Sequence, residues 1–435
     1  MHINKTVIAL IPFILLSALI SCGGGGSTSP AIHEPFGDYT LASSDKERDR
    51  SPNVAGSDLG TLENGNTEFA LDLYKAIKDK NDNIFYSPYS ISIALAMTYA
   101  GARGDTETQM ADAMDYYLPQ DKLHPAFNAL DLELASRGSK VSPDKRFKLN
   151  IANSLWGEKT WNFLPAFLDT LAENYGAGLR LVDFAGAPDD ARVVINDWVD
   201  TMTEHKIPKL LDEGTVNSMT VLILVNAIYF NAQWKTAFVE EATEPGTFNL
   251  LDGGKVTVPM MSLSEENDYY EGDGFQTVKL PYTGDELSML VILPDSGKFD
   301  EFENSFDASG LDEIDNGLKN VEVNLKMPKF EYDMGMNLND TLSAMGMVDA
   351  FIPDLADFSG MDGTKMLYIQ WVIHKAYVKV DEAGTEAAAA TAVGMGYTSA
   401  PAETVDFVID RPFIFMIRDD KTGTVLFVGR VLNPS

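Results

Sequence analysis

Predicted helices fill the first half of this chain and predicted strands the second half, and no linker separates the two. Apolar residues recur at helical spacing from Phe69 to Ile77, with Asn66 or Thr67 available as the N-cap, and further helices are expected at 90–102, 165–175 and 189–203. Strand patterns follow at 221–225, 287–293 and 321–327, with a hairpin at 413–431. We therefore expect residues 58–435 to form one large α+β domain with mixed, mostly antiparallel sheets.

The amino terminus has the pattern of a signal peptide. Lys5 precedes an apolar run from Val7 to Ile20, which is too short to span a bilayer but suits the core of a signal. The run ends Leu-Ile-Ser-Cys at Cys22, which resembles the lipobox of bacterial lipoproteins, where the signal is cut before the cysteine and the thiol is acylated. An ordinary secretory signal with a chance cysteine is the alternative. The resemblance implies that residues 1–21 are removed and that acylated Cys22 anchors an exported protein to the lipid bilayer.

The anchor predicts a place in the cell envelope. Gly23 follows the cysteine, where an Asp is associated with retention in the inner membrane, so we expect the outer membrane, on its periplasmic or extracellular face. Residues 22–57 are rich in Gly, Ser, Pro and Asp and include the mixed-charge run from Asp45 to Arg50. This composition is typical of a flexible stalk that holds a domain clear of lipid.

Composition argues against several classes of function. The chain has 65 acidic and 33 basic residues, a net charge of -32, which opposes phosphate binding and makes nucleic acid an unsuitable partner. The single cysteine is incompatible with internal disulfides and with a Cys-ligated zinc site. The sequence contains neither a His-Glu-x-x-His nor a Gly-x-Ser-x-Gly motif. We expect no metal, no cofactor and no enzymatic activity; a hydrolase with paired carboxylates stays as the enzyme alternative, although no spacing singles out a pair.

The segment 381–401 does not fit an ordinary surface loop. It lies between two predicted strands, is rich in alanine, and has no charged residue between Glu386 and Glu403 in a chain that is otherwise strongly acidic. A short helix capped near Thr385 and followed by a Gly-rich loop is the simpler interpretation, because alanine has the highest helix propensity.

Motifs along the whole domain resemble those of the serpin family. The resemblance covers residues 66–435, and the motifs that carry it are Asn83-Ile84-Phe85-Tyr86-Ser87-Pro88, Gly101-Ala102-Arg103-Gly104-Asp105-Thr106, Val225-Asn226-Ala227-Ile228-Tyr229-Phe230, Val258-Pro259-Met260-Met261, His374-Lys375-Ala376, Asp410-Arg411-Pro412-Phe413 and Phe427-Val428-Gly429-Arg430-Val431. The resemblance implies the serpin fold, with three sheets, about nine helices and an exposed reactive-centre loop.

The resemblance also implies a function. Serpins are protease inhibitors, not enzymes: the protease attacks the loop and forms an acyl-enzyme, and the cleaved loop then inserts into the main sheet and traps the protease covalently. The expected partner is therefore a target protease, and the protein is expected to be a monomer. A non-inhibitory serpin that acts as a cell-surface binding protein is the alternative.

The hinge that precedes the loop distinguishes these two interpretations. Matching the family assigns the hinge to Glu382, Gly384, Thr385, Glu386, Ala387, Ala388, Ala389, Ala390 and Thr391. On insertion, alternate residues become buried, because side chains along a strand point to opposite faces. That set is Thr385, Ala387, Ala389, Thr391, Val393 and Met395. None is charged and none is proline, which favours a working inhibitor.

The family spacing predicts the bond that is cut. Counting seventeen residues from Glu382, or back fourteen from Pro412, gives Thr398, so the scissile bond is Thr398–Ser399. Tyr397 and Met395 are alternatives for the residue before the cut. No Lys or Arg lies between Asp381 and Asp410, so elastase-, subtilisin- or chymotrypsin-like proteases are expected rather than trypsin-like ones, with papain-like cysteine proteases also open.

Two further groups of residues are assigned by the resemblance. The positions of a polar cluster beneath the region where the sheet opens are Ser87, Ser90, Asn226 and His374. Trp234 matches the tryptophan where the loop first enters the sheet, although a buried aromatic at that position is also compatible with an ordinary core. We expect these residues to act in conformational change rather than in catalysis.

Overall fold

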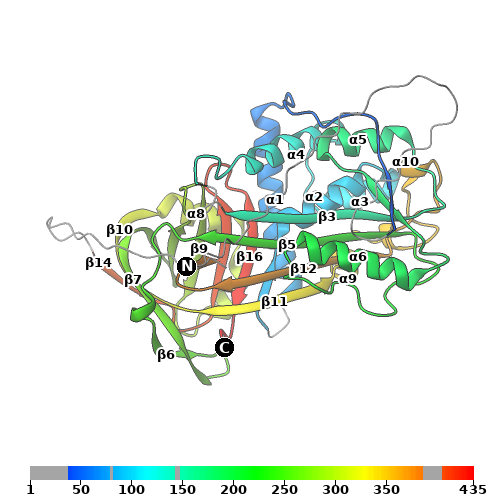
Figure 1. The fold of residues 1–435 in the computed structure, drawn as a ribbon. Helices are drawn as coiled ribbons and strands as arrows, with labels where there is room; N and C mark the ends of the chain where they lie inside the picture. The colour runs from blue at the N-terminus through cyan, green and yellow to red at the C-terminus, as the bar shows by residue number, and fades with distance from the viewer. Residues whose placement is uncertain (1–37, 79–81, 143–146, 386–403) are drawn as a thin grey trace, which may run out of the picture. The chain divides into compact units, whose positions relative to one another are not determined.

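The computed structural model describes residues 38–78, 82–142, 147–385 and 404–435 (Figure 1), all of which belong to one compact unit, residues 33–435. The predicted signal peptide and Cys22 lie outside the described residues, as do the hinge residues from Glu386 to Thr391 and the candidate cleavage-site residues Met395, Tyr397, Thr398 and Ser399.

A seven-stranded sheet forms the centre of the domain. Its strands, in order across the sheet, are β1 (Thr40–Ala42), β4 (Leu179–Val182), β3 (Lys148–Glu158), β5 (Leu222–Gln233), β13 (Gly384–Thr385), β12 (Trp371–Val380) and β11 (Phe330–Asn337). β5 and β12 pair with each other in parallel over residues 223–229 and 371–377, and the two-residue strand β13 separates them at one end. We call the boundary between β5 and β12 the seam.

The remaining strands form a second, nine-stranded sheet. These are β14 (Thr404–Val408), β10 (Lys319–Pro328), β7 (Lys255–Gly272), β8 (Phe275–Pro281), β9 (Leu287–Pro294), β15 (Phe413–Asp419), β16 (Val425–Val431), β2 (Ile84–Tyr86) and, paired with β7 alone, β6 (Glu244–Asn249). The expected three sheets therefore appear as two hydrogen-bonded networks in the described residues. The reason is β7, whose 18 residues pair with β6 and β10 along most of its length and with β8 at its end.

Ten α-helices and two short 3₁₀ helices lie in the described part of the chain. They are α1 (Gly56–Ile77), α2 (Pro88–Tyr99), α3 (Gly104–Ala113), α4 (Gln120–Ala135), α5 (Pro165–Tyr175), α6 (Pro188–Met202), η1 (Glu240–Ala242), α7 (Phe299–Ser305), α8 (Ala308–Gly317), α9 (Asn339–Ala344), η2 (Asp349–Phe351) and α10 (Ser359–Asp362). Among the described residues, no helix combines the length and apolar character needed to cross a bilayer.

The first helix begins well before its predicted cap. Neither Asn66 nor Thr67 starts α1, which extends back to Gly56. Gly65 lies inside the helix, where another part of the chain approaches closely. A Cβ atom at this position would be 2.2 Å from the carbonyl oxygen of Asp115. This glycine is required by packing and does not end the helix.

The two faces of the seven-stranded sheet pack against different helices. Even-numbered residues of β5, such as Leu224, Ile228 and Phe230, belong to the main core together with α1 and α2. Odd-numbered residues, such as Ile223 and Val225, belong to a smaller core beneath α6, which lies on the other face (Figure 1). Both faces are buried, which explains the continuous apolar run in this strand.

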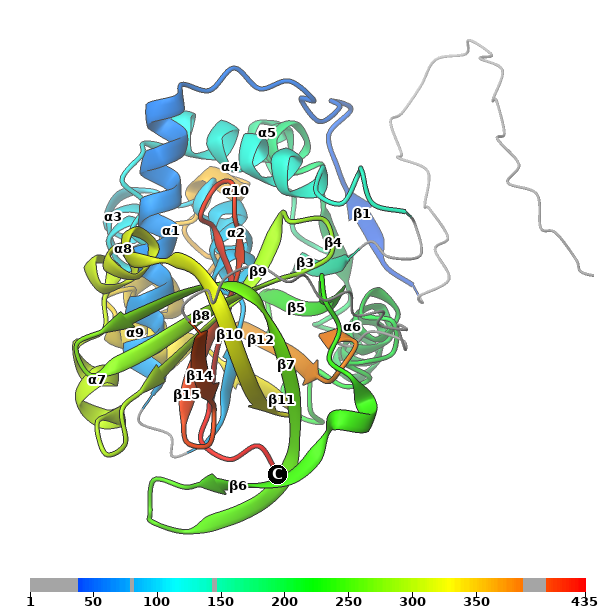
Figure 2. The same ribbon diagram turned by 90° about the vertical axis from the view of Figure 1, so that its left-hand side faces the viewer.

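The last part of the predicted stalk differs from a flexible linker. Thr40–Ala42 pairs antiparallel with β4 at the edge of the sheet (Figure 2). The guanidinium of Arg48 donates to Asn128 Oδ1 at 2.7 Å and to Asp131 Oδ2 at 2.6 Å on α4, and Lys46 Nζ lies 2.8 Å from Glu173 Oε1 on α5. Residues of the mixed-charge run therefore make specific polar contacts with α4 and α5. The ordered domain begins about 20 residues before residue 58.

Candidate functional site

The described part of the hinge enters the sheet at one end of the seam. Gly384 and Thr385 pair with Gln233 and Ala232 of β5, and Thr385 also pairs with Val380 of β12. The Thr385 side chain is fully buried, and its hydroxyl lies 2.7 Å from the hydroxyl of Tyr282. The first residue of the predicted alternating set is therefore buried between the two strands.

Gly384 is fitted closely against the neighbouring strand. A Cβ atom at this position would be 2.1 Å from the carbonyl oxygen of Ala232. No other residue can occupy this position without moving the backbone of β5 or of the hinge. The glycine thus permits the approach that brings Thr385 into the sheet.

An ion pair holds the hinge glutamate. Glu382 is 7% exposed; its Oε2 lies 2.5 Å from Lys329 Nζ, and its Oε1 accepts a hydrogen bond from the Thr243 hydroxyl at 2.7 Å. Burial alone would raise the pKa of Glu382, but the hydrogen bonds from Lys329 and Thr243 outweigh it and hold the pKa below its ordinary value. Glu382 is therefore ionised near neutral pH and fixed from two sides.

Trp234 lies beside the hinge, at the position where the resemblance predicts that the loop first enters the sheet. Its backbone N–H donates to the Ala383 carbonyl and its indole Nε1 to the Asp381 carbonyl, each at 3.0 Å. The indole stacks on Tyr282, with ring centroids 4.7 Å apart, and the backbone N–H of Phe238 donates to the Glu382 carbonyl at 2.9 Å. Trp234 therefore binds the hinge directly as well as packing in the core.

The predicted polar cluster lies halfway along the seam. Asn226 of β5 and His374 of β12 are direct partners in the parallel pairing, and the His374 Nδ1 bonds the side-chain oxygen of Asn226. The Asn226 amide nitrogen donates to Ser90 Oγ at 2.6 Å, and the Ser87 backbone N–H donates to His374 Nε2 at 3.3 Å. The four residues that the sequence analysis assigned to this cluster therefore lie together in one hydrogen-bonded network.

This network contains a neutral histidine. Burial lowers the pKa of His374 to about 3, because no carboxylate compensates for the loss of solvation of the charged ring. Since Nε2 accepts from Ser87, the proton of the neutral ring is on Nδ1 and is donated to Asn226. The hydrogen bonds therefore have a single consistent direction across the seam.

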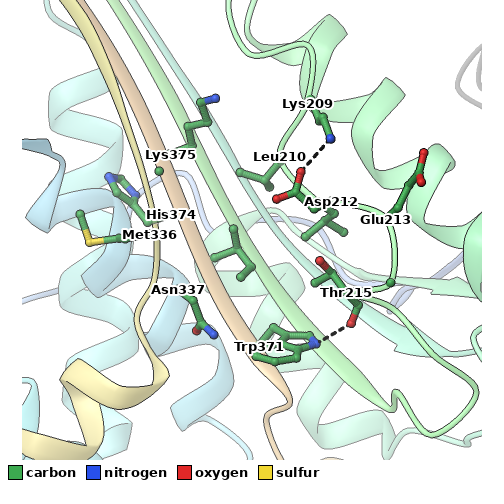
Figure 3. Close-up of a pocket in the computed structure, with 14 residues that line it drawn as sticks. Lys209, Leu210, Asp212, Glu213, Thr215, Met336, Asn337, Trp371, His374 and Lys375 are labelled. Atoms are coloured by element: carbon green, nitrogen blue, oxygen red, sulfur yellow. Dashed lines mark hydrogen bonds and ion pairs between the residues drawn. The ribbon is translucent and has the colours of Figure 1, made fainter.

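A cavity of about 700 Å³ lies over the far end of the seam (Figure 3). It separates the segment 209–215 from β11 and β12, and its wall includes Trp371 and Lys375. The segment is held by the Trp371 indole, which donates to the Thr215 carbonyl at 3.0 Å, and internally by the Lys209–Asp212 ion pair at 2.7 Å. This face of the seam is therefore covered by a loop that does not fill the space beneath it.

Several residues of the site are not evident from the sequence. Lys329, Thr243 and Tyr282 bind the hinge from positions far away in the chain, and nothing in their local patterns indicates it. Asn153 of β3 completes the polar cluster by donating to the Ser90 carbonyl at 3.0 Å. The strand also contains Lys148, Asn150, Ser154 and Glu158, so no local signal singles out Asn153.

The site joins the hinge to the central sheet. In the described ranges, no group of three or more His, Cys, Asp or Glu side chains is arranged to hold a metal ion. The site combines two parallel strands, a two-residue strand that separates them at one end, and a polar cluster that bridges them. These features place the start of the hinge inside the central sheet.

Comparison with known proteins identifies the family. Residues 64–434 match the family described as "Serpin (serine protease inhibitor)", so the chain belongs to the serpins, a family of protease inhibitors. It is 40% identical to the human leukocyte elastase inhibitor over 384 residues, which cover 86% of this chain and 99% of that protein.

Solved structures agree with this assignment. The native state of the thermophilic serpin tengpin superposes with a TM-score of 0.77 at 30% identity, covering 90% of this chain and 97% of that one. Uncleaved ovalbumin superposes with a TM-score of 0.76 at 29% identity, covering 86% of this chain and 100% of that one. The serpin fold expected from the sequence is therefore confirmed.

Proposed function

We propose that this protein is a suicide-type inhibitor that traps serine proteases as a covalent acyl-enzyme, by inserting its cleaved reactive-centre loop between β5 and β12. The observation that carries the proposal is the hinge strand β13. Gly384 and Thr385 already pair with β5 at the open end of the seam, so the loop needs only to extend an existing strand.

The register of the hinge supports this insertion. Thr385 pairs with Ala232 and Val380, and its side chain faces the main core. In a strand that continued in this register, every second residue would lie between one residue of β5 and one of β12. The expected neighbours are Phe230 and Val378 for Ala387, Ile228 and Ala376 for Ala389, and Asn226 and His374 for Thr391.

The residues expected at these positions fit the space between β5 and β12. Ala387 and Ala389 are small enough to fit between large core residues, and the Thr391 hydroxyl can replace the hydrogen bond between Asn226 and His374 that insertion breaks. Val393 and Met395 would gain about 1.5–3 kcal/mol each on full burial. A charged residue in this set would instead cost more than the roughly 2–7 kcal/mol of burying an unpaired neutral polar group.

The side chains on the other face of the inserted strand are small, as the space beneath the covering segment requires. Ala388, Ala390, Ala392 and Gly394 would lie on the side of α6 and the segment 209–215. Alanine has only a methyl group as its side chain, and glycine only a hydrogen atom. A strand with such a face can pass beneath a covering segment without large displacement of it.

The chemistry of trapping is acyl transfer. The serine Oγ of the protease attacks the Thr398 carbonyl carbon, an ester forms, the C–N bond to Ser399 breaks, and the protease histidine delivers the proton to the leaving amine. Deacylation then needs a water molecule and an intact oxyanion hole. Insertion of the loop drags the ester-linked protease across the inhibitor and disorders the protease triad and oxyanion hole before that water reacts.

The class of protease follows from the loop. The absence of Lys and Arg from Asp381 to Asp410 favours elastase-, subtilisin- and chymotrypsin-like enzymes over trypsin-like ones. The name of the human relative, leukocyte elastase inhibitor, supports an elastase among the targets. Papain-like cysteine proteases are a further class to test, because Tyr397 precedes the proposed Thr398–Ser399 bond.

The proposal includes export and anchoring by lipid. Removal of residues 1–21 and acylation of Cys22 would tether the inhibitor to the cell envelope, at the outer membrane, on its periplasmic or extracellular face. Metabolic labelling with a fatty acid tests this step: the wild-type chain should incorporate label and partition into detergent, and the Cys22→Ser variant should do neither.

A protease panel tests inhibition. The protein is mixed with pancreatic elastase, chymotrypsin, subtilisin, papain and trypsin, and the products are separated on denaturing gels and weighed. We expect a denaturant-resistant complex with at least one of the first three and release of a peptide that begins at Ser399. Cleavage of the loop without a complex across the whole panel would overturn the proposal in favour of a non-inhibitory binding protein.

A further inference from the structure

A second, smaller cavity lies beside the residues that bind the hinge. It has a volume of about 220 Å³ and is enclosed by the segment 234–238, by β7 and by the end of β8. We propose that this cavity binds a small aromatic amine carrying an oxygen that accepts a hydrogen bond.

An unpaired amide supplies the polar contact. Asn267 lines the cavity and is 6% exposed, and its Nδ2 has no hydrogen-bond partner among the described residues. A buried donor without a partner is destabilising, because it has lost its hydrogen bonds to water. An oxygen on a ligand in the cavity would recover this loss, with at most a rotation of the amide about its last bond.

The walls favour a single aromatic ring. Trp234 and Phe238 meet edge to face, with ring centroids 6.3 Å apart, and Leu263 and Leu280 complete the apolar lining. Aromatic ligands gain from such contacts beyond the area that they bury. The volume corresponds to about seven water molecules, which suits one ring with a short side chain.

The charge at the cavity favours a cation. Glu265 lies on the same side of β7 as Leu263 and Asn267, because side chains alternate along a strand. It is exposed and makes no ion pair with a described residue, whereas Lys235 at the same cavity is paired with Asp285 at 2.8 Å. The net charge lining the opening is therefore negative, and an ammonium group is attracted to it.

The cavity shares its wall with the hinge. Trp234 donates two hydrogen bonds to the carbonyl groups of Asp381 and Ala383, and Phe238 donates one to Glu382. These contacts hold the segment 234–238 in place, so the wall of the cavity is formed before a ligand binds.

Binding is tested on the wild-type protein with matched probes. Tyramine has the ring, the oxygen and the amine; phenethylamine lacks the oxygen, and 4-ethylphenol lacks the amine. We expect saturable binding of tyramine, measured by calorimetry or tryptophan fluorescence, with about tenfold weaker binding of phenethylamine because one hydrogen bond is lost. Equal affinity of the two amines, or no saturable binding of tyramine, would overturn the site.

Two variants assign the contacts of the ligand. Asn267→Leu should weaken tyramine about tenfold without changing the affinity for phenethylamine, and Glu265→Gln should weaken both amines but not 4-ethylphenol. Unchanged affinity of Asn267→Leu for tyramine would overturn the polar contact, and unchanged affinity of Glu265→Gln for both amines would overturn the preference for a cation.

Discussion

His374 of β12 and Asn226 of β5 form a hydrogen bond across the seam, at the position where the two strands are direct partners in the parallel pairing. Any strand that enters the seam must break this bond. The register of the hinge would bring Thr391 to this point, a residue whose hydroxyl both donates and accepts. The cluster around His374 therefore closes the sheet with polar contacts that one inserted residue can replace.

The neutral state of His374 predicts a pH dependence of stability. The pKa is lowered to about 3 in the folded protein, against about 6.5 when unfolded, so the unfolded chain binds the extra proton as pH falls below 6.5. His374 should therefore cost about 2 kcal/mol of stability between pH 6.5 and 5. His374→Gln should show a correspondingly weaker loss of stability over this range.

Unfolding midpoints at several pH values measure the effect of His374→Gln. His205→Gln is the matched control, because the His205 side chain is 75% exposed. Parallel pH profiles of the wild-type protein and His374→Gln would show that the buried ring does not remain neutral.

Replacement of Thr385 by arginine should turn the inhibitor into a substrate. The Thr385 side chain is fully buried beside Tyr282, and a guanidinium there would be buried without a counter-charge. Insertion should become slower than deacylation, so most of Thr385→Arg is cleaved without forming a complex. Thr404→Arg, at an exposed position on the other side of the loop, serves as the control. An unchanged stoichiometry of inhibition in Thr385→Arg would contradict the role of the hinge.

Removal of the cation beside Glu382 should loosen the hinge. Lys329→Met leaves a nearly buried carboxylate with only the Thr243 hydroxyl, and we expect a loss of about 1–2 kcal/mol at pH 7, since Lys329 is itself partly exposed. The pKa of Glu382 is lowered in the wild-type protein, so the stability it contributes is present above the unfolded pKa and is lost as pH falls.

The difference between Lys329→Met and the wild-type protein should therefore shrink as the pH approaches 4. Thermal unfolding at pH 7 and pH 4 measures it. Lys326→Met, which removes an exposed lysine from the same strand region, should have little effect at either pH. A stability difference between Lys329→Met and the wild-type protein that is the same at pH 7 and pH 4 would argue against the ion pair.

The segment before α1 should contribute to stability. Arg48 donates hydrogen bonds to Asn128 and Asp131, and Arg48→Met should cost about 2 kcal/mol, because hydrogen bonds to charged groups are among the stronger ones. Arg50→Met, two residues further on at an exposed position, should leave the unfolding midpoint unchanged. Equal midpoints for the two variants would restore the interpretation of this segment as a flexible stalk.

Local signals in the sequence predicted much of the fold. The helix at 165–175 coincides with α5, because Pro165 marks its first turn and Gly176, with a φ of 60°, ends it. The strand at 287–293 corresponds to β9, whose apolar run is buried on both faces. The hairpin at 413–431 is confirmed as β15 and β16. In each case the information lies within the element itself.

Local sequence patterns do not predict contacts between residues that are far apart in the chain. Lys329 lies 53 residues from Glu382, and Tyr282 lies 103 residues from Thr385, and neither has a local pattern that indicates its partner. The pairing of Thr40–Ala42 with β4 was missed for the same reason, since its composition resembles a linker until its partners are known. The assignments of Asn226, His374 and Trp234 came from family resemblance, because spacing alone does not bring them to the seam.

The central claim is that the cleaved loop becomes a strand between β5 and β12 in the register set by Thr385. In a Cys22→Ser background, Ala389→Cys is combined with Ala376→Cys, the residue of β12 that this register places opposite it. Ala388→Cys with Ala376→Cys is the control, because a shift of one residue turns the side chain to the other face. The account predicts a disulfide in the first variant, detected by mass, after loop cleavage and not before. No disulfide after complete cleavage, or an equal yield in the control, would contradict it.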